Sequence, residues 1–164
     1  MDLITSQDYT NTIENQYELE RGKPMPSTNH SQIQTNIVLA LAKYRKEFSF
    51  FTELNLELTS GRAVPDVCIY PKIAINWRKD VLRRPDAPII AIEILSPRQA
   101  LDDITTKIDT IYFPADVKVA WIIFPTLQTV HILTPDGKTK AYTEGVIRDP
   151  TTGIEISIDD IFVD

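Results

Sequence analysis

Two segments that are apolar on both faces of a strand, with a helix-like segment between them, constrain the fold of this chain most strongly. Residues 89–95 read IIAIEIL and residues 118–124 read KVAWIIF. Strands without a polar side are typical of the interior of a sheet that is covered on both faces. Residues 96–113 carry apolar side chains at helical spacing, behind a Ser-Pro helix start with Ser96 as N-cap and Gln99 completing a capping box. This order predicts a right-handed crossover and parallel pairing of the two strands.

Shorter segments complete the predicted sheet. Residues 51–58 alternate between leucine and polar side chains, which indicates a strand with one wet face, and residues 64–71 indicate its neighbour. Further strands are expected at 17–23, 128–134, 140–144 and 153–158, and a helix at 30–48 behind N-cap candidates at 27–29. The predicted class is α/β with mixed α+β character, in which helices flank a mixed central β-sheet.

Length and charge limit the possible classes of protein. The chain has 164 residues, which favours a single domain over 1–164, with residues 1–15 as an N-terminal arm or short helix. The net charge of −6 argues against a protein that coats nucleic acid nonspecifically. Two basic clusters, at 43–46 and 78–84, are expected to be solvated surface.

Compartment and redox chemistry follow from what the sequence does not contain. The single cysteine, Cys68, excludes an internal disulfide and a cysteine-based zinc cluster. No apolar run is long enough for a membrane span, and the first residues lack the pattern of a signal peptide. We therefore expect a cytoplasmic protein without a membrane partner.

A glutamate at the centre of an apolar strand is the first candidate functional residue. Glu93 lies inside residues 89–95, where an isolated carboxylate costs on the order of several kcal/mol unless it is paired or bound to a cation. Glu93 could pair with a buried lysine or arginine, or lie at the end of the strand and reach water. It could also belong to a metal site.

Asp66 favours the metal site. It follows Pro65 in the preceding predicted strand, and adjacent strands lie about 4.8 Å apart. If both carboxylates point to one face, a divalent cation relieves their repulsion, and a small set of oxygen ligands completed by water suits Mg²⁺. Metal-assisted phosphodiester hydrolysis is the reaction class that uses such a site.

The same residues resemble a known family. Pro65-Asp66 followed by Glu93-Ile94-Leu95 resembles the PD-(D/E)XK signature of restriction-endonuclease-like folds, and the whole pattern is similar to the Uma-two (Uma2) family of restriction endonucleases. The matching pieces run in order from about residue 17 to residue 125. They are Tyr17-Glu18-Leu19 with Gly22, the Ser27 to His30 helix start, Pro65-Asp66-Val67, Ile92 to Pro97, Lys107 with Tyr112, and Val117 to Trp121.

The resemblance implies a restriction-endonuclease-like mixed sheet and a set of site residues. Asp66 and Glu93 would be metal ligands for Mg²⁺, with Mn²⁺ as a substitute. Leu95 stands where the superfamily has its lysine, and the resemblance implies that Lys107 of the following helix replaces it. Glu18 and His30 would line the same site as an additional acid and a phosphate- or proton-handling group.

Each of the last three residues also has an ordinary structural interpretation. Lys107 could form a surface pair with Asp103 one helical turn away, worth about 0.3–0.5 kcal/mol. Glu18 could be an exposed strand residue, and His30 could be a residue of a capped helix start. Asp116 departs from the family, which usually has glycine before Val117, although aspartate tolerates a left-handed backbone.

Three functions remain open from the sequence. The first is an Mg²⁺-dependent endonuclease that hydrolyses phosphodiester bonds of DNA, with a homodimer as a possible assembly. The second is a catalytically inactive binding or regulatory module on a nuclease-like scaffold, because fold does not guarantee activity. The third is a hydrolase of a small phosphorylated molecule.

Overall fold

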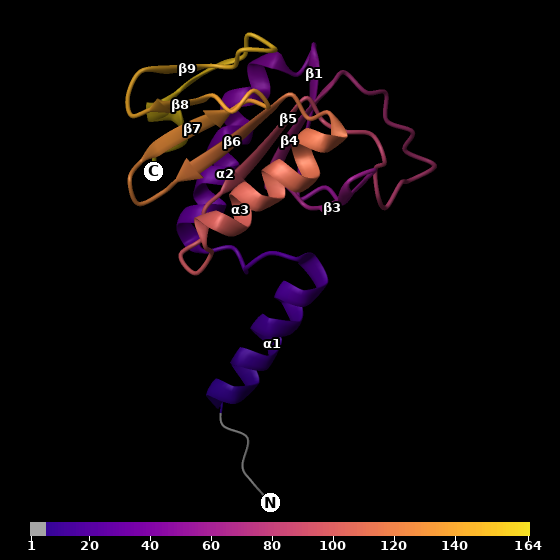
Figure 1. Cartoon of the computed structure of the whole chain (residues 1–164), viewed down its shortest axis with the longest axis vertical. Coiled ribbons are helices and arrows are strands. Elements are labelled where there is room, and N and C mark those ends of the chain that lie inside the picture. Colours follow the sequence, from indigo (N-terminus) through magenta and orange to yellow (C-terminus); the bar gives the residue numbers. More distant parts are fainter. Residues whose placement is uncertain (1–5) are drawn as a thin grey trace, which may run out of the picture.

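The computed structural model describes residues 6–164, apart from the side chain of Tyr9. A mixed sheet lies at its centre, with helices on both faces (Figure 1). The strands of this sheet, in spatial order, are β1 (Phe48–Thr52), β4 (Val67–Pro71), β5 (Ile90–Ile94), β6 (Val119–Phe124), β7 (Thr129–Leu133) and β8 (Thr139–Tyr142).

The two doubly apolar strands form the parallel pair of the sheet. β5 runs parallel to β6, and helix α3 (Leu101–Lys107) lies in the connection between them, as the sequence predicts. The other neighbouring pairs of the sheet are antiparallel. Both central strands are buried along most of their length. The predicted class, a mixed sheet flanked by helices, is therefore confirmed.

Two apolar layers cover the sheet. On one face, alternate residues such as Val67, Ile92 and Trp121 pack against α2 (Thr28–Leu41), α4 (Ile158–Ile161) and the hairpin of β9 (Val146–Arg148) with β10 (Glu155–Ser157). On the other face, Cys68 and Ala91 pack against α3 and the hairpin of β2 (Leu56–Leu58) with β3 (Gly61–Ala63). None of the helices in the described part of the chain is long and apolar enough to cross a membrane.

The predicted strand at 17–23 is wrong. These residues continue helix α1 (Ser6–Arg21), which projects away from the sheet in Figure 1. Their Glu, Leu and Arg residues are good helix formers, and helix-breaking proline comes only at Pro24. Gly22 ends the helix at a φ of 67°, and its N–H donates to the carbonyl of Glu18 at 2.7 Å.

The predicted strand at 51–58 is two strands in different sheets. β1 ends at Thr52, Glu53 adopts a left-handed φ of 54°, and β2 begins at Leu56 in the separate hairpin. The leucine alternation is real, since Leu56 and Leu58 are buried, but it continues across the break. Alternation alone does not reveal a change of sheet.

The crossover helix begins later than the sequence predicts. Ser96 is not its N-cap, because residues 96–99 form a turn in which the N–H of Gln99 donates to the carbonyl of Ser96 at 3.0 Å. The helix starts at Leu101, after Ala100 as N-cap. It continues beyond Lys107 as a π-helical turn at Ile108–Tyr112 and a 3-10 turn at Phe113–Ala115.

Candidate active site

Asp66 and Glu93 lie side by side on neighbouring strands. β4 and β5 pair with Val67 opposite Ile92, so Asp66 and Glu93 occupy the next position of the same register. Glu93 points to the face that α3 covers, where it contacts Lys107 and Tyr112, whereas Asp66 lies just before β4 and contacts His30 of α2. The N–H of Ile94 donates to Oδ2 of Asp66 at 2.7 Å, which fixes the aspartate against β5. The two acids that the sequence predicts to converge therefore lie next to each other at the end of the β4–β5 pair, and both side chains are buried.

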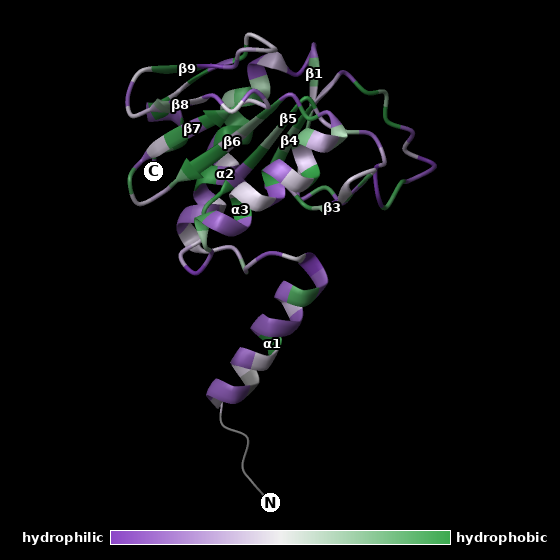
Figure 2. Cartoon of the chain, viewed as in Figure 1, coloured by the Kyte–Doolittle hydropathy of each residue, from purple (hydrophilic) through white to green (hydrophobic). Residues whose placement is uncertain are grey.

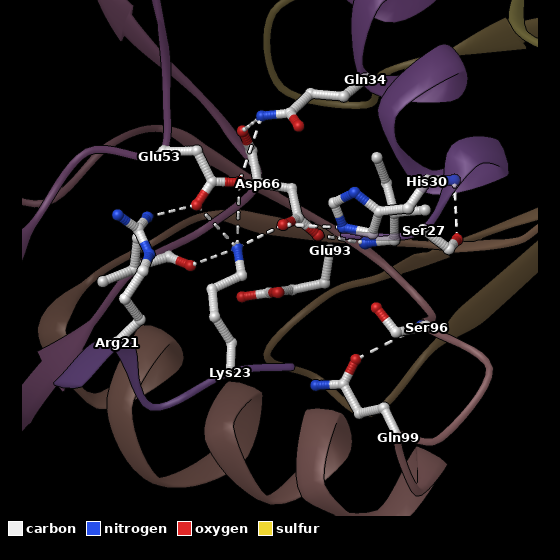
Figure 3. Close-up of polar contacts among 12 residues, drawn as sticks. Arg21, Lys23, Ser27, His30, Gln34, Glu53, Asp66, Glu93, Ser96 and Gln99 are labelled. Carbon is white, nitrogen blue, oxygen red and sulfur yellow. Dashed lines mark hydrogen bonds and ion pairs between the residues drawn. The ribbon is translucent and has the colours of Figure 1, made fainter. Parts of the chain in front are cut away.

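Two neighbours keep Asp66 ionised: the ammonium of Lys23 and the imidazole of His30 (Figure 3). Its Oδ1 contacts the ammonium of Lys23 and lies 3.0 Å from Nε2 of His30. Burial alone raises the pKa of this carboxyl. The hydrogen bond from His30 and the charge of Lys23 outweigh that effect and lower the pKa to about 2.

Glu93 is held from the crossover connection. Its Oε1 accepts hydrogen bonds from Nζ of Lys107 at 3.1 Å and from the hydroxyl of Tyr112. In an α-helix, residues five positions apart point about 140° away from each other. The π-helical turn between Lys107 and Tyr112 widens the backbone so that both reach one carboxylate. The pKa of Glu93 is raised, mainly by burial and also by the charge of Asp66, against the effect of Lys107.

Lys107 reaches the buried acid and does not form the surface pair along its own helix. Among the described residues its ammonium pairs with Glu93, and the alternative pair with Asp103 is not formed. The strain of a buried acid in a central strand is relieved by this lysine and by Tyr112. This contact agrees with both interpretations of Glu93: a buried acid paired with a lysine, and a ligand of a metal site.

Lys23 joins the site without any signal in the sequence. It follows the glycine that ends α1, and it is only 7% exposed. Its ammonium contacts Asp66 and Glu53 and donates to the carbonyl of Val64 at 3.1 Å. Burial lowers the pKa of Lys23, but the charges of Asp66 and Glu93 have a larger opposite effect, so the pKa is raised overall. A lysine in a turn is ordinarily exposed, which is why sequence reasoning misses it.

Glu53 is the second residue that sequence reasoning misses. Its left-handed backbone turns the side chain toward Lys23, to which both carboxylate oxygens lie at 3.3 Å. Arg21 pairs with the same carboxylate, and Nε2 of Gln34 lies 3.3 Å from it and 2.8 Å from the carbonyl of Asp66. Figure 3 shows Glu53 at the centre of these contacts, between Arg21, Lys23 and Gln34.

His30 lies where the resemblance places it. Ser27 caps α2 as predicted and accepts from the N–H of His30 at 3.2 Å. The imidazole is buried, with Nε2 toward Asp66. Its Nδ1 is buried and has no hydrogen-bond partner among residues 6–164. His30 is thus oriented by the aspartate, and its second nitrogen is buried without a partner among the described residues.

Glu18 does not reach the two central acids. It is exposed on α1 and lines a polar cavity of about 640 Å³ between α1 and α3. Lys23 and Lys107 lie at the inner side of the same lining, and Arg98 and Glu14 form an ion pair at 3.2 Å across it. Glu18 therefore borders the approach to the site.

Asp66 and Glu93 are the two acidic side chains at the centre of the site, and carboxylate oxygens are ligands that Mg²⁺ accepts. In the described part of the chain, no three or more His, Cys, Asp or Glu side chains are grouped to hold a metal. Mg²⁺ commonly binds through one or two carboxylates and keeps several waters. The hydrogen bonds from Lys107 and Tyr112 both go to Oε1 of Glu93, and the side chain of Glu93 is buried. Asp66 offers Oδ1 once Lys23 moves aside.

Comparison with known proteins identifies the family. The Uma2 family, described as "Putative restriction endonuclease", matches residues 7–159. The chain belongs to the Uma2 family. No protein in the curated set matches it. This Uma2 chain is similar to the crystal structure of a "putative nuclease belonging to DUF820" from Anabaena variabilis ATCC 29413. The TM-score is 0.71, with 26% identity over 85% of this chain and 83% of that one. The recognition from sequence motifs is confirmed.

Proposed function

We propose that this Uma2 protein is a metal-dependent endonuclease that hydrolyses phosphodiester bonds of DNA. The observation that carries the proposal is the pair of buried carboxylates, Asp66 and Glu93, next to each other at the end of the β4–β5 pair and behind two lysines that line a polar cavity. A chain keeps such a pair at considerable cost in solvation. Family membership and the nuclease-like fold support the same reaction class.

Asp66 and Glu93 are the residues that would hold Mg²⁺. When bound, this ion supplies a Lewis acid and lowers the pKa of a bound water. Asp66 suits the role because it stays ionised across the physiological pH range. The raised pKa of Glu93 falls back as positive charge approaches, so a cation favours its ionised form.

Lys107 and Lys23 supply positive charge on either side of the two acids. Both lysines belong to the lining of the cavity, and the ammonium group of each contacts one of the carboxylates. A phosphate oxygen that enters the cavity finds a donor from each lysine, which binds the group and offsets charge that develops on it. Lys107 would thereby take the role of the superfamily lysine, whose position in this sequence is occupied by Leu95.

His30 would orient a water molecule or accept its proton at Nδ1, the ring nitrogen without a partner in the described part of the chain. Asp66 fixes the imidazole through Nε2, so Nδ1 is the nitrogen without a proton when the ring is neutral. An Asp-oriented imidazole of this kind accepts a hydrogen bond from water or a substrate hydroxyl.

Cleavage assays with matched variants test the proposal. Supercoiled plasmid, a linear oligonucleotide and free nucleotides are incubated with the protein and Mg²⁺, Mn²⁺ or EDTA. DNA cleavage is expected with either metal, none with EDTA, and a loss of at least 100-fold in Asp66→Asn and Glu93→Gln. The exposed Glu144→Gln serves as control. Metal-independent cleavage, or equal cleavage by Asp66→Asn, contradicts the proposal, and turnover of nucleotides alone redirects it to small phosphorylated substrates.

A second candidate function is a noncatalytic nuclease-fold module. It is favoured by the contact between Lys23 and Asp66, which already neutralises one of the acids. The net charge of −6 points the same way. A metal titration separates the two, because the noncatalytic module predicts no Mn²⁺ binding that depends on Asp66 and Glu93.

A further inference from the structure

The loop between β4 and β5 exposes large apolar side chains on a highly charged segment. Trp77 is 91% exposed and Leu82 is 86% exposed, whereas the other tryptophan, Trp121, is fully buried. We call residues 76–84 of this loop the basic loop. Exposed tryptophan side chains are enriched where a protein meets another molecule, because the indole ring carries a large apolar surface.

The basic loop also concentrates positive charge in an acidic chain. It contains Arg78, Lys79, Arg83 and Arg84 against a single acid, Asp80, although the net charge of the protein is −6. The side chains of Arg78, Lys79 and Arg83 are exposed and form no ion pair with residues 6–164. Three cations are therefore free to meet an anionic partner.

Arg84 has a different role, because it anchors the basic loop. Its guanidinium pairs with Asp86 at 2.8 Å and lies 5.2 Å from the centre of the Tyr70 ring. Its N–H donates to the carbonyl of Asn55 at 2.9 Å, and its carbonyl accepts from Glu57 at 2.8 Å. The base of the loop is thus fixed to the segment that follows Glu53, which contacts Lys23 in the candidate site.

Beyond these anchors the loop projects from the body of the protein. Figure 1 shows it extending past β3, and Figure 2 shows hydrophobic and hydrophilic residues alternating along it. Along the sequence, Arg78, Lys79 and Asp80 separate the apolar residues Trp77 and Val81, and residues 76–84 do not form the amphipathic helix of a segment that lies on a membrane surface. Unpaired cations favour a polyanionic partner, and aromatic residues among Arg and Lys are typical of surfaces that bind nucleic-acid strands.

We propose that the basic loop is a nucleic-acid-binding element, in which Arg78, Lys79 and Arg83 contact phosphates and Trp77 stacks on a base. This inference rests on the proposed function for the choice of DNA as the nucleic acid. The loop would hold a strand, while the segment to which Arg84 anchors it, residues 55–57 after Glu53, leads to the acids. It requires no cleavage, so binding and catalysis can be measured separately.

Tryptophan fluorescence gives a direct readout, since Trp77 is exposed and Trp121 is not. The full-length protein in EDTA is titrated with a single-stranded oligonucleotide and with a duplex at several salt concentrations. Quenching with saturation is expected. Trp77→Ala, followed by fluorescence anisotropy of labelled DNA, is expected to weaken binding by roughly tenfold, as loss of one stacked base does. Trp77→Phe should retain most of the affinity.

The charges are tested by the salt dependence of binding. Arg78→Gln, Lys79→Gln and Arg83→Gln are each expected to reduce the slope of log K against log salt by about 0.7 for a single strand. Lys43→Gln and Lys46→Gln make the same charge change in the other exposed basic cluster and serve as controls. The control variants should leave the slope unchanged.

Three outcomes would overturn the inference. They are unchanged affinity in Trp77→Ala, equal slopes in the loop and control variants, and loop-dependent binding to anionic phosphatidylserine vesicles but not to DNA. The proposed function fails separately. If the protein binds DNA through the basic loop but never cleaves it, the inference about the loop holds and the proposed nuclease function is wrong. If the protein cleaves DNA and the loop variants change neither cleavage nor binding, the nuclease function holds and the inference about the loop is wrong.

Discussion

The ammonium of Lys23 lies against Oδ1 of Asp66, on the carboxylate that is the first candidate ligand for a metal ion. The same ammonium lies 3.3 Å from both oxygens of Glu53. The positively charged ammonium of Lys23 thus lies between the carboxylates of Asp66 and Glu53. Metal binding at Asp66 requires this lysine to move, and a competition between the two cations follows.

Replacing Lys23 should therefore strengthen metal binding while weakening the fold. Lys23→Met removes the competing charge and leaves Asp66 buried without its cation, which costs several kcal/mol in the metal-free protein. We expect Mn²⁺ affinity, measured by isothermal titration, to rise by about tenfold, equivalent to about 1.4 kcal/mol. Lys118→Met, an exposed lysine, is the control. Weaker Mn²⁺ binding by Lys23→Met would show that the lysine supports the site instead.

The hydroxyl of Tyr112 should matter through Glu93 alone. Tyr112→Phe keeps the buried ring and removes one of the two donors to Oε1 of Glu93. Loss of a hydrogen bond to a buried acid costs about 1–3 kcal/mol. Urea unfolding should show a decrease of that size, compared with a much smaller change in Tyr142→Phe, whose hydroxyl lies at the surface beside Arg148. Equal stability of both variants would mean that Tyr112 does not support Glu93.

Acid should destabilise the protein through Asp66. The pKa of Asp66 in the folded protein is about 2, against an ordinary value of 3.8. At pH values above the ordinary pKa, this lowered pKa stabilises the fold by about 2 kcal/mol. The contribution is lost as the pH falls from the ordinary pKa through the folded-state pKa of about 2. Asp66→Asn should therefore lose less stability than the parent protein between pH 4 and pH 2 in urea titrations. Parallel curves would contradict it, and Asp164→Asn at the exposed chain end is the control.

The turn before β6 offers a test of backbone strain. Asp116 has a φ of 75°, a left-handed conformation that glycine adopts without a steric penalty. Asp116→Gly should raise the free energy of unfolding by about 0.5–1 kcal/mol, and Asp116→Val should lower it. A loss of stability in Asp116→Gly would show that its exposed ion pair with Lys118 outweighs the strain.

The central part of the fold could be predicted because its signals are local and strong. The two apolar strands and the helical spacing between them specify the parallel β5–β6 pair. The register of β4 against β5 then brings Asp66 beside Glu93, which follows from strand neighbours and alternation. The resemblance added His30 and Lys107, and both contact the predicted acids.

The remaining features depend on contacts between distant residues, which no local pattern reveals. Glu53 leaves its strand through a left-handed backbone, and its partners Arg21 and Lys23 come from the end of α1. The π-helical turn that places Tyr112 has no sequence signature, since its residues also suit an α-helix. The strand predicted at 17–23 failed because a short segment gives too little periodicity to separate helix from strand.

Diffraction from crystals soaked in Mn²⁺ tests the central claim most directly. Anomalous scattering locates the ion without reference to activity. The account predicts one strong peak within coordination distance of a carboxylate oxygen of Asp66 and one of Glu93, with Nζ of Lys23 displaced from Asp66. Density for Lys23 still on Asp66, with no peak at the two acids under saturating Mn²⁺, would contradict it.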